Sequence, residues 1–244
     1  MSERIRLADL DEQMQGAIAG TRQRVADLHA ELPRWGLVVW TAGNVSERVV
    51  VDRGDGPVKT DLFVIKPSGV SYDELTADTM VICTLDGEKI DDGTPASLTP
   101  SSDTAAHAYV YRHMDGVGGV VSTCAPSAAA WAGRREPIPC ALTMMGDEFG
   151  GDIPIGPFAL IGDDSIGRGI VETLEDSRSP AVLMANHGPF TVGKDARDAV
   201  KAAVMCEEVA RTMSIAEQLG DVKPIPADMV DRLNDRYQNV YGQH

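Results

Sequence analysis

Apolar runs of only four or five residues recur between turn-forming residues, and this spacing restricts the fold more than any other feature. Residues 37–40, 62–65, 80–83, 118–121 and 181–185 are runs of this kind. Short apolar runs bounded by Gly, Asp or Pro are typical of buried strands. None approaches the roughly 20 apolar residues needed to cross a bilayer, so we expect no membrane span.

Helical periodicity alternates with these runs. Apolar residues recur at helical spacing over 8–31, with Pro33 just past the predicted end, and over 195–219. Shorter helices are predicted over 126–132, over 166–174 and from a Ser101 or Ser102 cap to His113, whereas the Pro-rich segment 137–160 is predicted to be extended. Helices that alternate with strands favour an α/β or α+β fold in which helices cover a central sheet.

The chain length favours a single domain. One hydrophobic core can serve a protein of 244 residues, so residues 1–244 are expected to form one domain. Within it, residues 1–19 are expected to be either a flexible or a packing helical extension.

The net charge indicates which ligands the protein can bind, and the spacing of its cysteines indicates its cellular compartment. A formal charge of -15 disfavours nucleic acid, because binding a phosphate backbone needs clustered Lys and Arg, but a small anion can still be bound locally. The first 30 residues carry charges and no apolar core of a signal peptide. The four cysteines, Cys83, Cys124, Cys140 and Cys206, are far apart. We therefore expect a cytoplasmic protein with reduced thiols, of which three simply pack.

Three loops share a composition suited to an anion. Residues 41–46, 66–70 and 100–104 are rich in Gly, Ser, Thr and Asn. Glycine permits close backbone approach, hydroxyl and amide groups donate to oxyanions, and a serine pair that opens a helix lies at its positive end. Each loop alone is as well explained by turn chemistry, but their joint occurrence favours a phosphate site.

Five segments carry a family resemblance. They are Gly-Asn-Val-Ser at 43–46, Lys-Pro-Ser-Gly-Val at 66–70, Pro-Ser-Ser-Asp-Thr at 100–104, Asn-His-Gly-Pro-Phe at 186–190 and Tyr-Gly-Gln at 241–243. In this order they resemble the motifs of the class II aldolase/adducin family, closest to its L-ribulose-5-phosphate 4-epimerase members, over roughly residues 20–243. Each motif is weak alone, but their conjunction is specific.

The resemblance implies a fold, an assembly and a set of site residues. It implies an α/β/α three-layer fold around a mainly antiparallel sheet, a homotetramer with sites between neighbouring subunits, and a divalent metal, usually zinc. The substrate phosphate would be held by Asn44, Ser68, Gly69, Ser101 and Ser102, with Lys66 nearby. The acid and base that move the proton of the C4 hydroxyl would be Asp147 and Tyr241, and Thr143 would line the same site. From composition alone, Asp147 could equally be a turn carboxylate, Tyr241 a packing aromatic and Thr143 a buried hydroxyl.

The chain departs from the family at the metal. The family holds its metal with a His-x-His at a strand end and a third histidine in the later His-Gly motif, which is His187 here. Ser122 and Cys124 occupy the first two positions. Strand alternation would point both to one face. A neutral Ser hydroxyl is a poor zinc ligand, whereas Cys thiolate, His and Asp are good ones. Asp103, Cys124 and His187 could therefore still form a three-ligand site.

Cys124 and the histidines admit other interpretations. Cys124 could be an inert buried thiol, or an acid, base or nucleophile paired with His187. The position of His187 after a buried strand favours a site residue. His107 is expected to be structural, and His29, His113 and His244 are expected at the surface.

Three functional hypotheses follow. The first is an epimerase or aldolase that acts on a phosphorylated ketose through retro-aldol or enolisation chemistry, with an altered or absent metal centre. The second is a non-catalytic sugar-phosphate-binding protein. The third is a metal-independent isomerase or lyase of a specialised pathway that uses Cys124.

Overall fold

One seven-stranded sheet forms the centre of the protein, in the order β3-β2-β1-β4-β7-β6-β5. The structure is a computed structural model that describes residues 5–241, without the side chain of Tyr241. All neighbouring strands run antiparallel except β5 and β6, which are parallel. The strands are β1 Asn44–Asp52, β2 Pro57–Ile65, β3 Val81–Thr84, β4 Gly119–Ser122, β5 Ile155–Gly156, β6 Ala181–Met184 and β7 Gly188–Gly193. The mainly antiparallel sheet is therefore confirmed.

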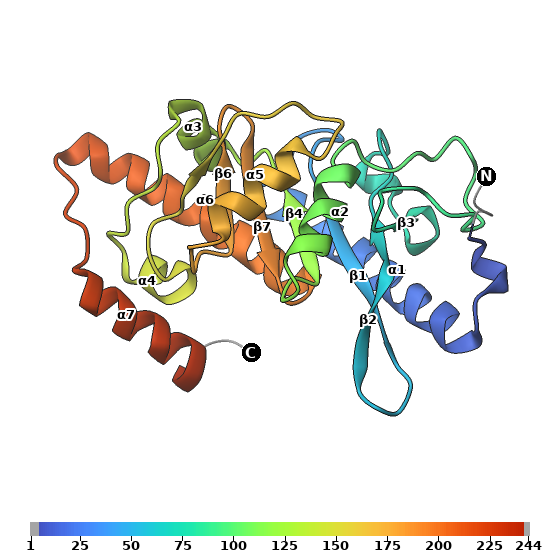
Figure 1. Ribbon diagram of the computed structural model, residues 1–244. Helices are drawn as coiled ribbons and strands as arrows, with labels where there is room; N and C mark the ends of the chain where they lie inside the picture. Colours follow the sequence, from blue (N-terminus) through green and yellow to red (C-terminus); the bar gives the residue numbers. More distant parts are fainter. Residues whose placement is uncertain (1–4, 242–244) are drawn as a thin grey trace.

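Helices cover both faces of this sheet (Figure 1). Because strand residues alternate between faces, Val121 packs in a core with α3 and α6, whereas its neighbour Val120 packs in a core with α2 and α5. The helices are α1 Glu12–Arg34, α2 Thr104–His113, α3 Pro126–Arg134, α4 Thr143–Phe149, α5 Ser165–Leu174, α6 Ala196–Leu219 and α7 Ala227–Arg236. Short 3-10 turns lie at η1 Leu7–Asp9, η2 Tyr72–Glu74 and η3 Ala77–Thr79, and a π-helical turn, η4, spans Tyr237–Tyr241. The predicted α/β/α layering is confirmed.

α1 packs along β1 rather than forming a loose extension. The side chain of Asp11 caps it by accepting the backbone N–H of Met14 at 2.8 Å. Its buried stripe recurs every three or four residues and faces the sheet: Ile18, Thr21, Val25, His29 and Leu32. Pro33 lies inside the last turn of the helix, so the prediction that it follows the helix end was wrong.

Several elements differ from the sequence-based expectations. Residues 37–40 are not a strand, because the chain turns there: the N–H of Ala42 donates to the carbonyl of Val39, and Trp40 adopts a left-handed φ of 55°. The motif at 43–46 was interpreted as a loop, but Asn44 begins β1. β7 and α7 were not predicted, and α4 interrupts the segment expected to be extended.

The start of α2 also differs. Asp103, not a serine, occupies the N-cap position, and its side chain makes no capping hydrogen bond. The hydroxyl of Ser101 instead accepts the backbone N–H of Asp103 at 3.3 Å. The carboxylate of Asp103 is thereby left to contact other elements.

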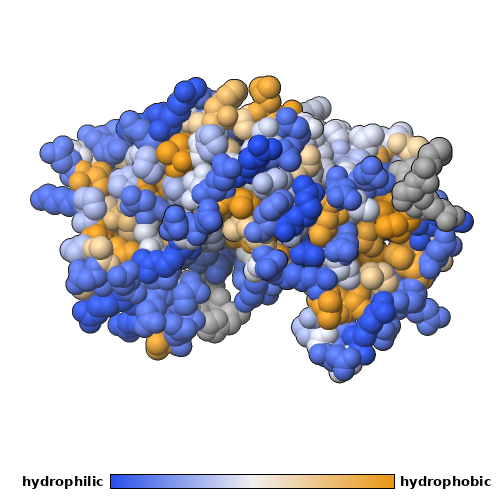
Figure 2. All heavy atoms as spheres, viewed as in Figure 1, coloured by the Kyte–Doolittle hydropathy of each residue, from blue (hydrophilic) through white to orange (hydrophobic). Residues whose placement is uncertain are grey.

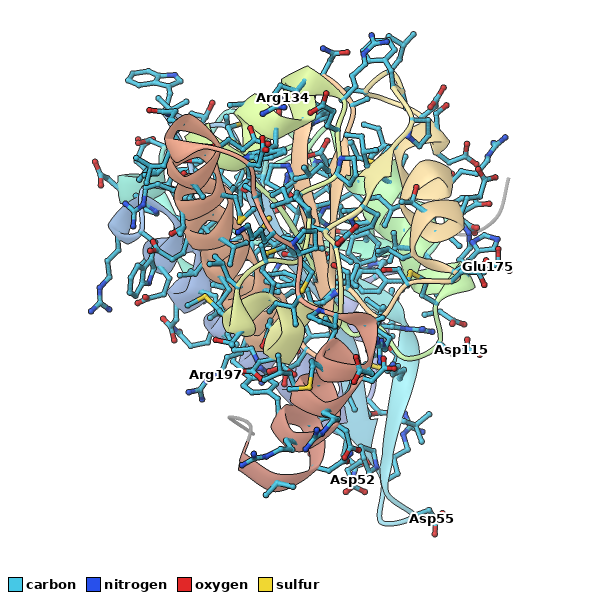
Figure 3. The ribbon with its side chains drawn as sticks, turned by 90° about the vertical axis from the view of Figure 1, so that its left-hand side faces the viewer. Asp52, Asp55, Asp115, Arg134, Glu175 and Arg197 are labelled. Atoms are coloured by element: carbon cyan, nitrogen blue, oxygen red, sulfur yellow. The ribbon has the colours of Figure 1, made fainter. Side chains whose placement is uncertain are left out.

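The β1–β2 hairpin extends below the rest of the sheet (Figure 1), and Asp52 and Asp55 lie at its tip (Figure 3). Figure 2 shows a mainly hydrophilic face with apolar patches, including one over the hairpin, where Val50 and Val58 are exposed. Across residues 5–241, no helix has both the length and the apolar character required to span a membrane.

Candidate active site

The predicted phosphate loops and the altered strand end meet at one edge of the sheet. In antiparallel pairing the start of β1 lies beside the ends of β2 and β4, and the start of β7 lies beside the ends of β4 and β6. Asn44, Lys66, Ser122 and His187 are therefore delivered to the same edge, the upper one in Figure 1. Ser101 joins them because its N–H donates to the carbonyl of Lys66 at 3.1 Å.

Asn44 connects the loops. Its Nδ2 donates to the hydroxyl of Ser101 at 3.0 Å and to Oδ2 of Asp103 at 2.8 Å, and the amide is buried. These partners lie 57 and 59 residues away in sequence. Its Oδ1 is buried without a hydrogen-bond partner among the described residues. A buried amide oxygen in this state is available to a donor from a ligand or a water.

The remaining predicted phosphate residues are accessible beside this junction. Ser68, Gly69 and Ser102 are exposed, and the N–H of Ser68 donates to the carbonyl of Thr99 at 2.8 Å, which links the second and third loops. Gly69 has a φ of +71°, and no atom lies within 4 Å of the position that a side-chain carbon would occupy. Open space therefore adjoins this backbone, as close approach of a phosphate requires.

Lys66 lies beneath these loops. The residue is only 2% exposed, and its Nζ donates to the carbonyls of Thr41 at 3.1 Å and Pro67 at 3.3 Å. Nζ also lies 5.3 Å from the centre of the Tyr72 ring. Burial lowers the pKa of Lys66 to about 8, because a buried ammonium is poorly solvated.

The segment Ser122-Thr123-Cys124 lies at the end of β4. β4 ends at Ser122, which is buried between Asn44 and Phe190 in the sheet, whereas Cys124 lies beyond the strand and is exposed. The regular strand therefore does not extend to Cys124, and the expectation that both side chains share one face stays a prediction. The other three cysteines are buried free thiols, as expected.

Cys124 is exposed, yet its surroundings disfavour a thiolate. Partial burial raises the pKa of the thiol, and the negative charge of Asp103 raises it further. The neighbouring hydroxyl of Thr123 is buried and has no hydrogen-bond partner within the described part of the chain. In the absence of a bound cation, the Cys124 thiol thus ionises less readily than an ordinary thiol.

The proposed metal ligands do not form a set. His187 is half-buried in the turn between β6 and β7, with its ring edge-on to Phe190 at 5.2 Å. Asp103 already accepts the Asn44 amide. Within residues 5–241, no three or more His, Cys, Asp or Glu side chains lie together as a metal site. Asp103, Cys124 and His187, as arranged in this chain, do not fit a zinc ion.

The predicted acid–base residues lie elsewhere in the fold. Thr143 and Asp147 are on α4, which packs chiefly against α7, at the left of Figure 1 and away from β1 and α2. The amide of Asn234 on α7 donates to the backbone carbonyl of Asp147 at 2.9 Å. Tyr241 ends the π-helical turn, and its side chain lies outside the described residues. The described chain does not bring Thr143 and Asp147 to its own phosphate loops.

Tyr72 and His29 were missed by sequence reasoning. The Tyr72 hydroxyl donates to the carbonyls of Ala42 at 2.9 Å and Gly43 at 3.1 Å. His29 is buried, so its predicted surface position was wrong. Its Nε2 accepts the N–H of Val45 at 3.0 Å, while Nδ1 lies 2.6 Å from the carbonyl of Val25. Isolated aromatic residues in 3-10 turns or long helices carry no motif that would reveal these contacts.

His107 lies one helical turn after Asp103, on the sheet-facing side of α2. Its Nδ1 is 2.7 Å from the hydroxyl of Ser46, which is also 2.7 Å from the hydroxyl of Tyr111. Burial lowers the pKa of His107 to about 4, although the charge of Asp103 opposes this shift. Because Asp103 and His107 are four residues apart on a predicted helix, their spacing could have indicated that His107 lies next to Asp103. Its expected structural role stays a prediction.

Comparison with known proteins gives a consistent relationship. Residues 23–214 match the family described as Class II Aldolase and Adducin N-terminal domain. The chain is 42% identical over 208 residues to L-ribulose-5-phosphate 4-epimerase UlaF of Salmonella paratyphi C, which covers 80% of this chain and 84% of that protein. The Salmonella typhi protein of the same name gives the same identity and coverage.

Solved structures share the fold. An L-fuculose 1-phosphate aldolase superposes with a TM-score of 0.78 at 22% identity and covers 90% of this chain and 96% of its own. YgbL of Klebsiella pneumoniae, described as a putative aldolase/epimerase/decarboxylase, superposes with a TM-score of 0.72 at 26% identity and covers 89% and 99%. These likenesses agree with the three-layer architecture described above.

Proposed function

The chain belongs to the class II aldolase and adducin family, and from that premise we propose that it is an epimerase or aldolase acting on a phosphorylated ketose. The observation that carries the proposal is the junction at Asn44, whose amide joins Ser101 and Asp103 across the chain. It gathers phosphate donors at the edge of the sheet where the strand ends also meet. The 42% identity to named L-ribulose-5-phosphate 4-epimerases supports that substrate class.

The proposed reaction exchanges the configuration of one carbon by breaking and remaking a C–C bond. A base takes the proton of the C4 hydroxyl, the C3–C4 bonding electrons move onto the C2 carbonyl oxygen, and an enediolate and an aldehyde result. Re-addition to the other face of the aldehyde gives the epimer. In this proposal Ser68, Gly69, Ser101 and Ser102 hold the C5 phosphate, so that the aldehyde fragment, which carries it, stays bound while its carbonyl group turns to present the other face.

The metal centre is altered or absent in this proposal. A divalent metal in this family would stabilise the enediolate, and His187, Asp103 and Cys124 are the residues left to hold one. Their arrangement does not fit zinc, as described above, and so the steps assigned to this chain's residues do not depend on it. All four cysteines are free thiols, which agrees with a cytoplasmic location.

We also propose that the acid–base residues act in a neighbouring subunit of a homotetramer. Thr143 and Asp147 lie on α4, apart from the phosphate loops of the same chain. A groove that includes Met144 of α4 is lined by apolar and charged residues: Trp35, Leu37, Met144, Val204 and Met205, with Arg34, Glu207, Glu208 and Arg211. A second subunit that covers this groove would bring α4 close to its own phosphate loops, together with Tyr241.

Turnover and metal content test the reaction. The purified protein is mixed with L-ribulose 5-phosphate, the products are followed by NMR, and metal is measured on the same sample. We expect turnover with less than one zinc per chain. Rapid epimerisation with stoichiometric zinc would show that the ligand substitutions have been over-interpreted. Phosphate binding without turnover would favour the non-catalytic binding protein, which the dispersed ligand set also supports.

Mixing two inactive variants tests the shared site. Ser101→Ala removes a phosphate donor and Asp147→Asn removes the proposed acid–base carboxylate. If sites form between subunits, mixed tetramers regain roughly a quarter of the wild-type activity, because random assembly pairs two intact halves at one in four sites. The matched control mixes Ser101→Ala with Lys66→Met, which lie in the same half and cannot complement. Equal recovery in both mixtures, or none in either, would contradict the arrangement.

A further inference from the structure

Lys66 is a buried cation without an anionic partner in the described part of the chain. Its two hydrogen-bond acceptors are the neutral backbone carbonyls of Thr41 and Pro67, and it makes no ion pair there. Lysine is almost never fully buried unless it is paired, because an uncompensated charge is costly to remove from water. An ammonium has three N–H donors, so one donor and the whole positive charge stay available to a ligand. The ligand expected at this place is an anion.

Tyr72 fixes this ammonium on the side of the altered strand end. The ring faces Nζ at 5.3 Å, a cation–π contact, and the hydroxyl is anchored to the carbonyls of Ala42 and Gly43. A side-chain carbon at Gly43 would lie 3.4 Å from the Tyr72 hydroxyl and 3.0 Å from the carbonyl of Ser122. The turn that holds Tyr72 and Lys66 thus packs directly on the end of β4.

Tyr72 also lies near Cys124, beyond the end of β4. Burial raises the pKa of the Tyr72 hydroxyl, and the negative charge that Cys124 carries when ionised raises it further, so the two side chains are neighbours. Cys124 is exposed, so a ligand can approach from this side. The hydroxyl of Ser101, a predicted phosphate ligand, accepts the amide of Asn44 just before α2. Lys66 and Tyr72 lie beside Cys124, where the carbon chain of a phosphate-anchored ketose would then extend.

We propose that the Lys66 ammonium, positioned by Tyr72, stabilises the oxyanion that develops on the reacting end of the sugar, rather than the phosphate. The inference rests on the proposed function. When the C3–C4 bonding pair moves onto the C2 oxygen, the new negative charge meets a fixed cation. A preorganised charge of this kind lowers the barrier because it is matched to the transition state more than to the substrate. The chain keeps this cation where two histidine ligands are replaced by Ser122 and Cys124.

A binding experiment tests the assignment without requiring turnover. Inorganic phosphate and 4-phosphoerythronate are titrated calorimetrically into the wild-type protein, Lys66→Met, Ser101→Ala and the exposed control Lys223→Met. The carboxylate of 4-phosphoerythronate stands where C2 of a 5-phosphorylated ketose would lie, so its oxygens mimic the C2 oxyanion. We expect Lys66→Met to weaken 4-phosphoerythronate about tenfold or more and phosphate less than threefold. Ser101→Ala should weaken both anions equally, and Lys223→Met neither.

Two outcomes overturn the inference alone. If Lys66→Met weakens both anions to the same extent, Lys66 is a phosphate ligand, and if it weakens neither, the cation does not face the site. If the wild-type protein binds neither anion, the proposed function itself fails and the inference fails with it.

Kinetics supply a second, independent readout. Lys66→Met should lower kcat at least about a hundredfold with little change in KM, and Tyr72→Leu should lower it by a smaller factor because the ring no longer holds Nζ. Tyr72→Phe keeps the ring and should retain more activity than Tyr72→Leu.

A pH profile covers the case in which Lys66→Met does not fold. Lys66→Arg keeps the charge and should move the alkaline loss of kcat to higher pH. The groups facing Nζ are His29 on α1, the Tyr72 ring, and the carbonyls of Thr41 and Pro67. An alkaline limb unchanged in Lys66→Arg would overturn the proposal.

Discussion

The two halves of the candidate site are built differently. In the phosphate cradle, formed by Asn44, Ser101 and Asp103, buried and partly buried groups are joined by hydrogen bonds across distant loops. In the strand-end segment, Ser122-Thr123-Cys124, a buried hydroxyl lacks a partner among the described residues and the thiol is exposed. Hydrogen bonds between distant loops fix the side chains of the cradle. The side chains of Thr123 and Cys124 have fewer such contacts among the described residues. Substrate capture is therefore fixed more firmly in this chain than the group that performs the chemistry.

The largest expected effect concerns the histidines that secure the cradle. His29 bridges α1 to the start of β1, and His107 bridges α2 to Ser46, so both hold the strand that carries Asn44. Burial lowers their pKa values from an ordinary 6.5 to about 3 and about 4. The unfolded chain therefore binds more protons than the folded chain below pH 6.5. Stability present above pH 6.5 is lost as the pH falls toward 4, by about 1.4 kcal/mol per pH unit for each histidine.

Denaturant unfolding at a series of pH values between 7 and 4 measures this slope. His29→Gln should reduce the slope by one proton, or about 1.4 kcal/mol per pH unit, even though its stability at pH 7 is lower. His113→Gln is the matched control, because His113 is exposed at the end of α2. An unchanged slope in His29→Gln would mean that His29 is already protonated in the folded protein.

The next largest effect is expected when Asn44 of the cradle is replaced, compared with the replacement of an exposed asparagine elsewhere. Asn44→Ala removes the donor to Ser101 and Asp103 and leaves a buried carboxylate without that partner. We expect kcat/KM to fall about 100- to 1000-fold, and the free energy of unfolding to fall by about 1–3 kcal/mol. Steady-state kinetics with L-ribulose 5-phosphate and chemical denaturation measure the two quantities.

Asn239→Ala provides the control for this change, because its amide bonds only the exposed Asp235 at 2.8 Å. Its kinetics should match the wild-type protein. Full activity in Asn44→Ala would mean that the substrate phosphate does not bind in the cradle. The cradle would then not be the part of the site that captures the substrate.

The same contrast explains what could be predicted from the sequence. Short apolar runs predicted β4 and β6, and helical periodicity predicted α5 and α6, because burial of one face imposes a pattern on the residues themselves. The shared composition of the three loops and the family resemblance predicted one phosphate site, and the structure shows that Asn44, Ser101 and Lys66 lie at one edge of the sheet. Their partners Tyr72 and His29 were not predictable, because contacts between distant segments leave no local pattern.

Local patterns in the sequence also have limits. The prediction that Ser122 and Cys124 share one face rests on strand alternation, and β4 ends at Ser122. Residues 37–40 were predicted to be a strand from their composition, but Trp40 is 87% exposed in a left-handed turn. Apolar composition indicates burial only on average, and this turn keeps the backbone carbonyl of Thr41 in contact with Lys66.

The smallest expected effect tests whether the strand-end segment performs chemistry. Burial and Asp103 raise the pKa of the Cys124 thiol, so the nucleophilic thiolate is scarce near pH 7. Cys124→Ser should therefore change kcat less than about threefold. Iodoacetamide should give a single adduct by mass spectrometry, at Cys124, because Cys83, Cys140 and Cys206 are buried. The rate of this reaction should rise with pH and level off at a higher pH than for an ordinary exposed thiol, because the pKa of Cys124 is raised. A hundredfold loss of kcat in Cys124→Ser at unchanged stability would instead make the thiol the reacting group, and the strand-end segment would then be as much a part of the machinery as the cradle.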